Sequence, residues 1–344
     1  MPAPDLRVLH NLLGDRLSAL PLAIVYITDR CNSKCITCDY WRFGQTNMAL
    51  AAARSLSAQL DSLGTRAVLI SGGEPLLHPQ WPDVVAALRG AGRELTLLTS
   101  GILLARHAAR VAALCSHTTV SLDAATPAPY REIRGVDGLA LVERGVRALV
   151  ERGAPVSLRC TVQRANYADL PAVVRTARAW GVQSVSFLAV DVSTHQAFAR
   201  QGEFERQMAL TAEDLPRFDA VLASMQREFA AEFASGFIAE SPARLRELRQ
   251  YFAALLGLAE LPPVRCNAPR FSAVIETDGS LKPCFFLPAW GKLAGRELSA
   301  ALNDPAAVAL RRAQRLGRRA ECGRCVCSAW RSPRQLLGLE GPIG

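Results

Sequence analysis

The sequence predicts an α/β protein made of a partial (βα)6 TIM-like barrel and a small C-terminal cysteine-rich extension with a β-hairpin and a helix. Three observations lead to this prediction. Apolar, strand-like runs alternate with helix-period segments through the first 190 or so of the 344 residues, a pattern typical of parallel strands joined by helices. The alternation then stops, and two cysteines flank a hairpin turn signal further along the chain. Half of the residues are hydrophobic, which is enough for a sizeable core.

Six strand-like runs precede residue 191, and segments of helical periodicity separate them. The runs cover residues 22–27, 67–70, 95–99, 118–122, 156–162 and 184–190. Right-handed helical crossovers make such strands parallel, and six units are too few to close an eight-stranded barrel. We therefore expect an open barrel whose functional residues lie at the C-terminal ends of its strands.

Charge and hydropathy narrow the class of protein. The longest apolar run, residues 20–27, is far shorter than the ~18 residues that a membrane span requires, and Asp5 and Asp15 argue against a signal peptide. We therefore expect a cytoplasmic protein. The formal net charge of +9 favours an anionic partner without identifying it.

The ten cysteines fall into two clusters and two isolated positions. Clustered cysteines in a reducing cytoplasm are typical of metal sites rather than disulfides. The first cluster, Cys31, Cys35 and Cys38, directly follows a strand-like run. Three thiolates leave one coordination position of a metal centre for a group outside the protein.

The spacing of these three cysteines resembles that of the radical S-adenosylmethionine (radical SAM) superfamily. The resemblance implies that Cys31, Cys35 and Cys38 hold a [4Fe-4S] cluster whose fourth iron binds SAM. It also implies reductive cleavage of SAM to a 5′-deoxyadenosyl radical, chemistry that the cofactors supply and the protein positions. The alternatives are a three-cysteine zinc knuckle and a chance cluster.

Polar residues end the next strands, as the open barrel requires. Gly72, Gly73, Glu74 and Pro75 end the second strand, and by resemblance they form the family's glycine-rich segment for the methionyl amine of SAM. Further candidates, also by resemblance, bind the methionyl carboxylate and the ribose: Ser100, Ser121, Asp123 and Arg134. The two serines could instead only cap helices or satisfy the backbone.

On the fifth strand, Arg159 and Thr161 share one face and Cys160 the other, because side chains alternate along a strand. Thr37 stands where the family often has an aromatic residue beside the adenine. Tyr40, Trp41 and the strand around Leu188 are candidates for that contact. We assign no catalytic residue, and we expect the loop residue His195 to be solvated or structural.

A second set of cysteines begins on the predicted hairpin. Cys266 and Cys284 flank a turn at Asp278 and Gly279, and Cys322 and Cys325 follow later. Spacing alone leaves zinc ribbon and iron-sulfur cluster open. The arrangement resembles the SPASM or Twitch extension of radical SAM enzymes, which implies one auxiliary [4Fe-4S] cluster on these four cysteines. Cys327 is then spare or replaces Cys325, while Cys115 and Cys160 are expected to be buried core thiols.

The expected organisation has four parts. Residues 1–20 hold an amphipathic segment with Leu6, Leu9, Leu13 and Leu17 on one stripe, expected to pack on the barrel floor. Residues 21–190 form the barrel, 191–262 a helical linker and wall, and 263–335 the auxiliary-cluster domain. Ser241 and Pro242 predict one helix start in the linker, and residues 303–305 predict another in the extension.

The predicted function is that of a radical SAM oxidoreductase acting on a small anionic metabolite, with the auxiliary cluster as electron acceptor. One alternative is a maturase of a ribosomally made peptide. Another is a zinc protein that binds nucleic acid. The radical SAM oxidoreductase and the peptide maturase each require an electron donor such as flavodoxin or ferredoxin, and neither requires nucleic acid. Five arginines between residues 311 and 319 form either an anion-binding surface or a solvated helix face.

Overall fold

The computed structural model describes residues 5–90, 92–192, 194, 197–198 and 205–340. All six predicted barrel strands are present, each parallel to its neighbours. They are β1 (Leu22–Thr28), β2 (Ala67–Gly72), β3 (Glu94–Thr99), β4 (His117–Ser121), β5 (Val156–Val162) and β6 (Ser184–Ala189). The open α/β architecture predicted from the alternation is confirmed.

The sheet has nine strands, in the order β6-β5-β4-β3-β2-β1-β7-β8-β9. The three further strands are β7 (Ser272–Ile275), β8 (Ser280–Lys282) and β9 (Gly291–Lys292). β7 pairs in parallel with β1, and β8 returns antiparallel after the predicted turn, where Gly279 has φ 79°. The cysteine-bearing hairpin therefore extends the barrel sheet itself, because the fully buried β7 covers the open edge of β1.

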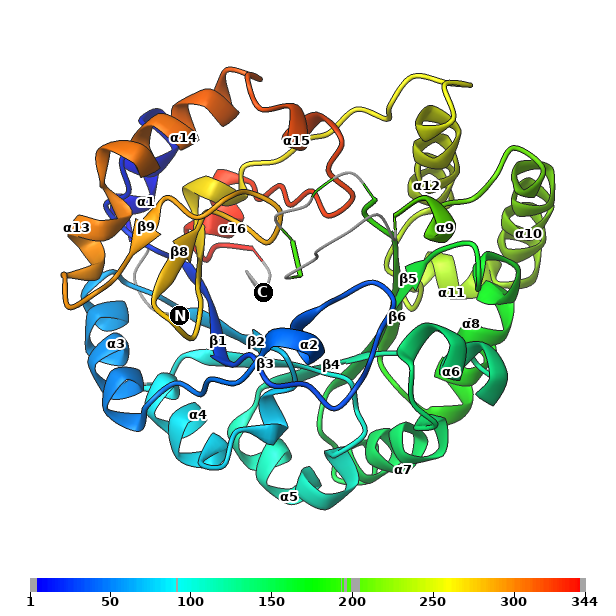
Figure 1. The fold of residues 1–344 in the computed structure, drawn as a ribbon, viewed down its shortest axis with the longest axis horizontal. Coiled ribbons are helices and arrows are strands. Elements are labelled where there is room, and N and C mark those ends of the chain that lie inside the picture. Colours follow the sequence, from blue (N-terminus) through cyan, green and yellow to red (C-terminus); the bar gives the residue numbers. More distant parts are fainter. Residues whose placement is uncertain (1–4, 91, 193, 195–196, 199–204, 341–344) are drawn as a thin grey trace.

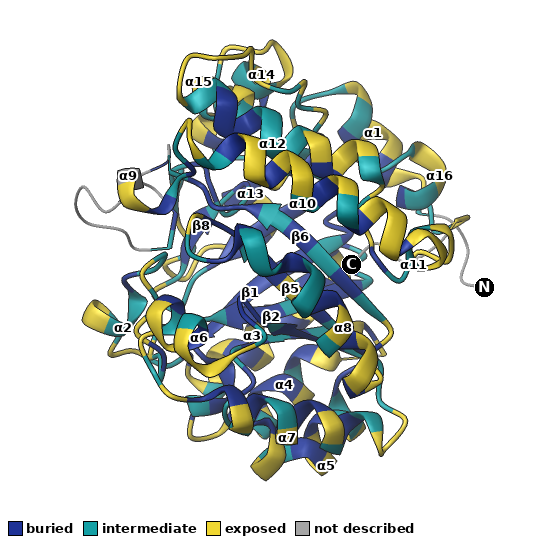
Figure 2. Ribbon diagram, turned by 90° about the vertical axis from the view of Figure 1, so that its right-hand side faces the viewer, coloured by how far each residue is buried: buried dark blue, intermediate teal, exposed yellow. Residues whose placement is uncertain are grey.

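Helices cover the outer side of the sheet in an arc that runs from α3 to α8 (Figure 1). They bury one apolar face each against the strands, as in other βαβ units. The main ones are α3 (Leu50–Ser62), α4 (Trp81–Arg89), α5 (Leu104–Leu114), α7 (Leu139–Val150) and α8 (Leu170–Trp180). Shorter elements at the strand ends are α2 (Tyr40–Phe43), η1 (Pro75–Leu77), α6 (Pro127–Arg134) and η2 (Tyr167–Asp169). Figure 2 shows the buried strands between these helices and a second group of helices.

The second group contains the predicted linker helices. These are α9 (Glu205–Met208), α10 (Asp214–Glu228), α11 (Ala230–Ala234) and α12 (Pro242–Leu255). The Ser241 hydroxyl accepts a hydrogen bond from the amide of Arg244 at 3.3 Å, so the predicted N-cap is confirmed.

The C-terminal segment adds η3 (Ala268–Arg270), α13 (Leu298–Leu302), α14 (Pro305–Arg315), α15 (Ala320–Gly323) and α16 (Pro333–Leu336). Asp304 caps α14, as the sequence predicts. Arg311 is buried and donates to the carbonyls of Asp15 and Leu302 at 2.6 Å. It therefore joins the N- and C-terminal segments, in contrast to the exposed arginines of the same helix.

The N-terminal helix α1 (Arg7–Leu13) corrects one expectation. Leu6, Leu9 and Leu13 are exposed, and only Leu17 of the predicted stripe is buried. Val8 and Asn11 face inward instead. The Asn11 amide nitrogen donates to the carbonyl of Ala19 at 2.8 Å, and its side-chain oxygen accepts from the amide of Ser18. These hydrogen bonds fix the rotation of the helix and turn the leucines outward. Among the described residues, no helix is both long and apolar enough to cross a membrane.

Candidate active site and cysteine clusters

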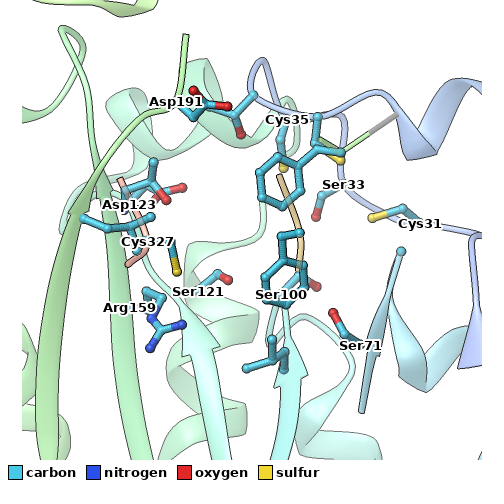
Figure 3. Close-up of a pocket in the computed structure, with 18 of the residues that line it drawn as sticks. Cys31, Ser33, Cys35, Ser71, Ser100, Ser121, Asp123, Arg159, Asp191 and Cys327 are labelled. Carbon is cyan, nitrogen blue, oxygen red and sulfur yellow. Dashed lines mark hydrogen bonds between the residues drawn. The ribbon is translucent and has the colours of Figure 1, made fainter. Parts of the chain in front are cut away.

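A cavity of about 240 Å³ lies at the C-terminal ends of the barrel strands, where the open barrel predicts functional residues. Its wall contains residues from the loop after β1, from the ends of β2 to β6 and from the C-terminal segment. Figure 3 shows Cys31 and Cys327 on opposite sides of it. The cavity thus brings both ends of the sequence to one site.

The predicted first cluster lines this cavity with all three thiols, Cys31, Cys35 and Cys38. The loop that carries them is held by the end of α6: the amide of Lys34 donates to the carbonyl of Arg134 at 2.9 Å. Gly135 makes this contact possible, because a Cβ there would lie 2.4 Å from the Lys34 carbonyl oxygen. The Arg-Gly pair of the sequence therefore supports the cysteine loop.

The surroundings of these thiols fit a thiolate-bound iron-sulfur cluster. Burial raises the pKa of Cys31 to about 11, while a backbone hydrogen bond from Ser33 opposes the shift. Ser33 Oγ and Arg134 Nε are buried without a hydrogen-bond partner, and Arg134 Nη1 donates to Cys35 Sγ at 3.7 Å. Unpaired buried donors beside thiols are suited to sulfur atoms of a cluster.

No group of three or more His, Cys, Asp or Glu side chains in the described ranges is gathered tightly enough to hold a single metal ion. In a [4Fe-4S] cluster each thiolate binds a different iron. The ligands of such a cluster are therefore further apart than those of one ion. Three thiols around a shared cavity are compatible with such a cluster.

Gly72 and Gly73 bring the end of β2 against the cysteine loop. A Cβ on Gly72 would lie 2.0 Å from the carbonyl oxygen of Thr28, and one on Gly73 would lie 2.2 Å from that of Arg30. Gly72 also has φ 126°, which side chains other than glycine rarely allow. Both residues line the cavity. The Gly73 amide already donates to the Thr28 carbonyl at 2.8 Å, so the carbonyl groups are the backbone atoms offered to a ligand there.

Glu74 and Pro75 do not line the cavity, because they lie beneath it. The Glu74 carboxylate is fully buried and accepts hydrogen bonds from Thr99 Oγ1 at 2.8 Å and from both the amide and hydroxyl of Ser100 at 2.7 Å. Burial raises the pKa of Glu74, and these donors oppose the rise. Glu74 therefore positions Ser100, which does line the cavity.

Ser121, Asp123 and Arg134 also line the cavity. Arg134 Nη2 lies 2.8 Å from Asp123 Oδ2, and the two side chains are 11% and 4% exposed. Burial alone lowers the pKa of Arg134, but Asp123 and Cys35 raise it, and the net shift is upward. The guanidinium therefore stays charged beside Cys35.

The cavity contains residues that the sequence did not single out. Leu188 lines it as expected, but Tyr40 and Trp41 do not, and the apolar contacts come from Phe198, Phe285 and Phe286. The rings of Phe198 and Phe285 stack with centroids 6.4 Å apart. In the sequence, Phe285 and Phe286 directly follow Cys284, and this aromatic pair beside a predicted cluster ligand could have indicated the contact.

Arg159 and Thr161 both line the cavity, and Cys160 is fully buried on the other face, as strand alternation predicts. Arg159 Nε donates to Ser186 Oγ at 3.3 Å. A neighbouring chamber of about 320 Å³ shares Arg159 and Cys327 with the first and extends to Glu240 and Arg244. His195 lies outside the described residues.

The second set of thiols is gathered by the hairpin and by α15. Burial raises the pKa of Cys284 to about 12, backbone hydrogen bonds from Phe286 and Leu287 oppose the rise, and the nearby Cys266 and Cys322 add to it. Cys325 interacts through space most with Cys327, and then with Cys266 and Cys284. Four neighbouring thiols with amide donors fit a fully protein-bound cluster.

Two cysteines outside the proposed clusters are core thiols, as predicted. Cys115 is 7% exposed and Cys160 is fully buried. Cys327, in contrast, lies beside Arg159 in the cavity wall (Figure 3).

Comparison with known proteins agrees with this geometry. Residues 25–177 match the radical SAM superfamily, and residues 266–326 match the SPASM iron-sulfur cluster-binding domain. The chain contains a radical SAM domain and a SPASM iron-sulfur cluster-binding domain. The predictions of SAM, a SAM-binding [4Fe-4S] cluster and auxiliary iron-sulfur binding are thereby confirmed at the level of the family.

Curated relatives match about half of the chain. A probable GTP 3′,8-cyclase of Methanococcus maripaludis is 26% identical over 197 residues, which is 55% of this chain and 66% of that protein. The Fe-coproporphyrin III synthase of Methanosarcina barkeri is 31% identical over 160 residues, 44% of this chain and 40% of that protein. The alignments therefore span between two fifths and two thirds of these relatives.

Solved radical SAM structures share the fold over more of the chain. SuiB of Streptococcus suis bound to S-adenosylmethionine has a TM-score of 0.66 at 15% identity, covering 94% of this chain and 76% of that one. The anSMEcpe enzyme with bound AdoMet and Cp18Cys peptide has a TM-score of 0.62 at 17% identity, covering 83% and 81%. These similarities confirm the open radical SAM fold with a C-terminal cysteine-rich region.

Proposed function

We propose that this radical SAM protein abstracts a hydrogen atom from a small anionic metabolite, with the auxiliary cluster as acceptor of the electron left on the substrate radical. The observation that supports this most is the shared cavity. Its wall combines Cys31, Cys35 and Cys38 with Phe285 and Cys327 of the C-terminal segment. A substrate enclosed there lies between the three thiols of the first set and the segment in which Phe285 directly follows Cys284.

In this proposal Cys31, Cys35 and Cys38 hold the SAM-binding cluster, and Cys266, Cys284, Cys322 and Cys325 hold the auxiliary cluster. The SAM-binding cluster and SAM, when bound, supply a 5′-deoxyadenosyl radical for hydrogen abstraction. The proposal also divides the chain into four parts, residues 1–20, 21–190, 191–262 and 263–335.

The residues around the cavity have distinct roles toward SAM. The backbone of Gly72 and Gly73 faces the methionyl amine, and the hydroxyls of Ser100 and Ser121 face its carboxylate and the ribose. Glu74 orients Ser100 through two hydrogen bonds. Asp123 orients Arg134 through their ion pair, and the pair keeps a positive charge beside Cys35.

An anionic substrate is supported by Arg159. Its guanidinium lies in the cavity wall and, among the described residues, has a hydrogen bond to Ser186 but no ion pair with a carboxylate. Arg159 lies at an exposed position where the cavity meets the neighbouring chamber, and Glu240 interacts with it through space. A guanidinium placed there offers two parallel donors to a carboxylate or phosphate of the substrate.

A ribosomally made peptide is the second candidate substrate. The adjoining chamber, which reaches Glu240, Arg244 and Glu247, gives room for polar groups beyond a small metabolite. Modification of a precursor peptide supplied in trans, or a peptide that co-purifies, would distinguish this substrate from a metabolite.

The test is anaerobic purification followed by iron and sulfide analysis and by turnover with SAM and a reductant. We expect a brown protein that forms 5′-deoxyadenosine, and deuterium transferred into it from a labelled candidate metabolite. A colourless protein with about two zinc ions and salt-sensitive RNA affinity would instead support the nucleic-acid-binding alternative.

A further inference from the structure

A second pocket, outside the proposed active site, lies beside Cys266 on the outer surface. It has a volume of about 560 Å³, and its wall includes Arg265, Arg270, Arg315 and Arg331. Within the described part of the chain, none of its lining residues is acidic. Such a concentration of guanidinium groups produces a positive potential that extends beyond the pocket.

The pocket has a fixed floor. Asn267 is 6% exposed, and its side chain donates to the carbonyl of Arg331 and accepts from the amide of the same residue, both at 2.9 Å. Gln314 of α14 donates to the carbonyl of Cys266 at 3.2 Å. Three separate segments are thus tied together around Cys266, so the pocket is already formed in the protein alone.

The rim has the composition of a protein interface. Trp330 is 42% exposed, and the guanidinium carbon of Arg265 lies 3.9 Å from its ring centroid. Tryptophan and arginine are the residues most enriched among those that dominate binding energy at interfaces. Asp15 pairs with Arg315 at 2.9 Å and neutralises part of this charge.

We propose that this pocket is the docking site of a small acidic one-electron carrier protein. The proposal rests on the proposed function, since it takes Cys266 as a ligand of the auxiliary cluster. Cys266 lies in the pocket wall, so a carrier seated there would contact a residue that would hold the auxiliary cluster. One electron is exchanged in each encounter: one partner is oxidised by one electron, the other is reduced, and no bond changes.

Charge and shape favour a protein over nucleic acid. The arginines converge on a compact pocket next to a redox site, whereas a nucleic-acid site follows the phosphates along a groove or stripe. Oligonucleotide binding is therefore an outcome that the experiment must be able to reveal.

The primary test measures binding of a purified flavodoxin to the reconstituted holoprotein by surface plasmon resonance at several salt concentrations. The test variant is Arg265→Glu/Arg331→Glu. The control variant, Arg106→Glu/Arg110→Glu, changes the net charge equally on α5, which lies at the opposite end of the molecule from α14 in both views (Figure 1, Figure 2). A single-stranded RNA oligonucleotide serves as competitor.

We expect binding that weakens with salt, and an association rate on the order of 10-fold lower in the Arg265/Arg331 variant, with a small change in the control. Trp330→Ala should accelerate dissociation without changing the salt dependence. Equal losses in both charge variants, no flavodoxin binding to the wild type, or displacement by RNA would each overturn the proposal.

A second measurement separates this proposal from the proposed function. In Cys31→Ala/Cys35→Ala/Cys38→Ala protein, only the auxiliary cluster should remain, and its reduction by flavodoxin hydroquinone is followed by stopped-flow absorbance. A protein without any cluster would contradict the ligand division of the proposed function. A cluster reduced equally fast with and without the Arg265/Arg331 changes would overturn the docking site alone.

Discussion

Arg134 and Asp123 form a nearly buried ion pair, with Nη2 2.8 Å from Oδ2, at the boundary between α6 and the barrel cavity. The same guanidinium donates to Cys35 Sγ at 3.7 Å. Asp123 Oδ1 also accepts from the amide of Thr161 at 2.7 Å. One carboxylate therefore joins β5, the end of α6 and the cysteine loop.

Asp123→Asn should destabilise the protein strongly, because it leaves the Arg134 charge buried without a counter-ion. The expected loss is about 3–5 kcal/mol of unfolding free energy, measured by urea denaturation. Asp137→Asn is the matched control, since Asp137 pairs with Arg131 where both are exposed, and should cost less than about 1 kcal/mol. Equal effects of the two changes would show that the buried pair contributes nothing beyond a surface pair.

Gly73→Ala should disrupt the first cluster site while leaving the second intact. The added Cβ would lie 2.2 Å from the Arg30 carbonyl oxygen, in the backbone that leads into Cys31. We expect about half of the reconstituted iron to be lost, as measured by iron and sulfide assays, if the two sites hold equal clusters. Gly291→Ala is the control, because nothing lies within 4 Å of its Cβ position. Full iron content in Gly73→Ala protein would contradict the role assigned to this glycine.

Removal of the auxiliary ligands should have a selective effect. Cys284→Ala/Cys322→Ala protein is expected to lose the auxiliary cluster but to retain the cluster on Cys31, Cys35 and Cys38, and therefore to keep the SAM-dependent change in its EPR spectrum. Cys115→Ser is a suitable control, because Cys115 is a buried core thiol. Loss of the SAM-dependent signal on removal of Cys284 and Cys322 would contradict their assignment to the auxiliary cluster.

Phe285→Ala should weaken SAM binding, because Phe285 lines the cavity and stacks on Phe198. Loss of one aromatic contact of about 1 kcal/mol corresponds to about a 5-fold higher Kd. Anaerobic isothermal titration calorimetry with SAM measures this change. Phe43→Ala is the control, because Phe43 is 50% exposed. An unchanged Kd for Phe285→Ala would show that Phe285 does not contribute to SAM binding.

Much of the barrel could be predicted because its signals are local. The strand-like run at residues 156–162 forms β5 with the predicted boundaries. Ser241 and Asp304 both cap the helices whose starts they predict. Apolar periodicity and capping depend on neighbours within a few residues, so they can be recognised without knowing the fold.

Long-range relations were less accessible. The leucine stripe of the N-terminal segment predicts a buried face. Asn11 faces inward instead, because its side chain donates to the carbonyls of Ala19 and Arg270. The local leucine pattern contains no information about these partners. The same reason explains Phe285 and Phe286, which line the cavity only because β7 pairs with β1 and brings the hairpin over the barrel.

The sequence by itself determined the alternating strands, the two cysteine clusters and the superfamily resemblance, because spacing along the chain carries that information. Tertiary structure alone decided that Glu74 lies beneath the cavity and orients Ser100, that Cys327 lies in the cavity wall, and that Arg159 lies beside it. These relations depend on which segments meet across the sheet, and packing and hydrogen bonds between residues far apart in the chain fix that meeting.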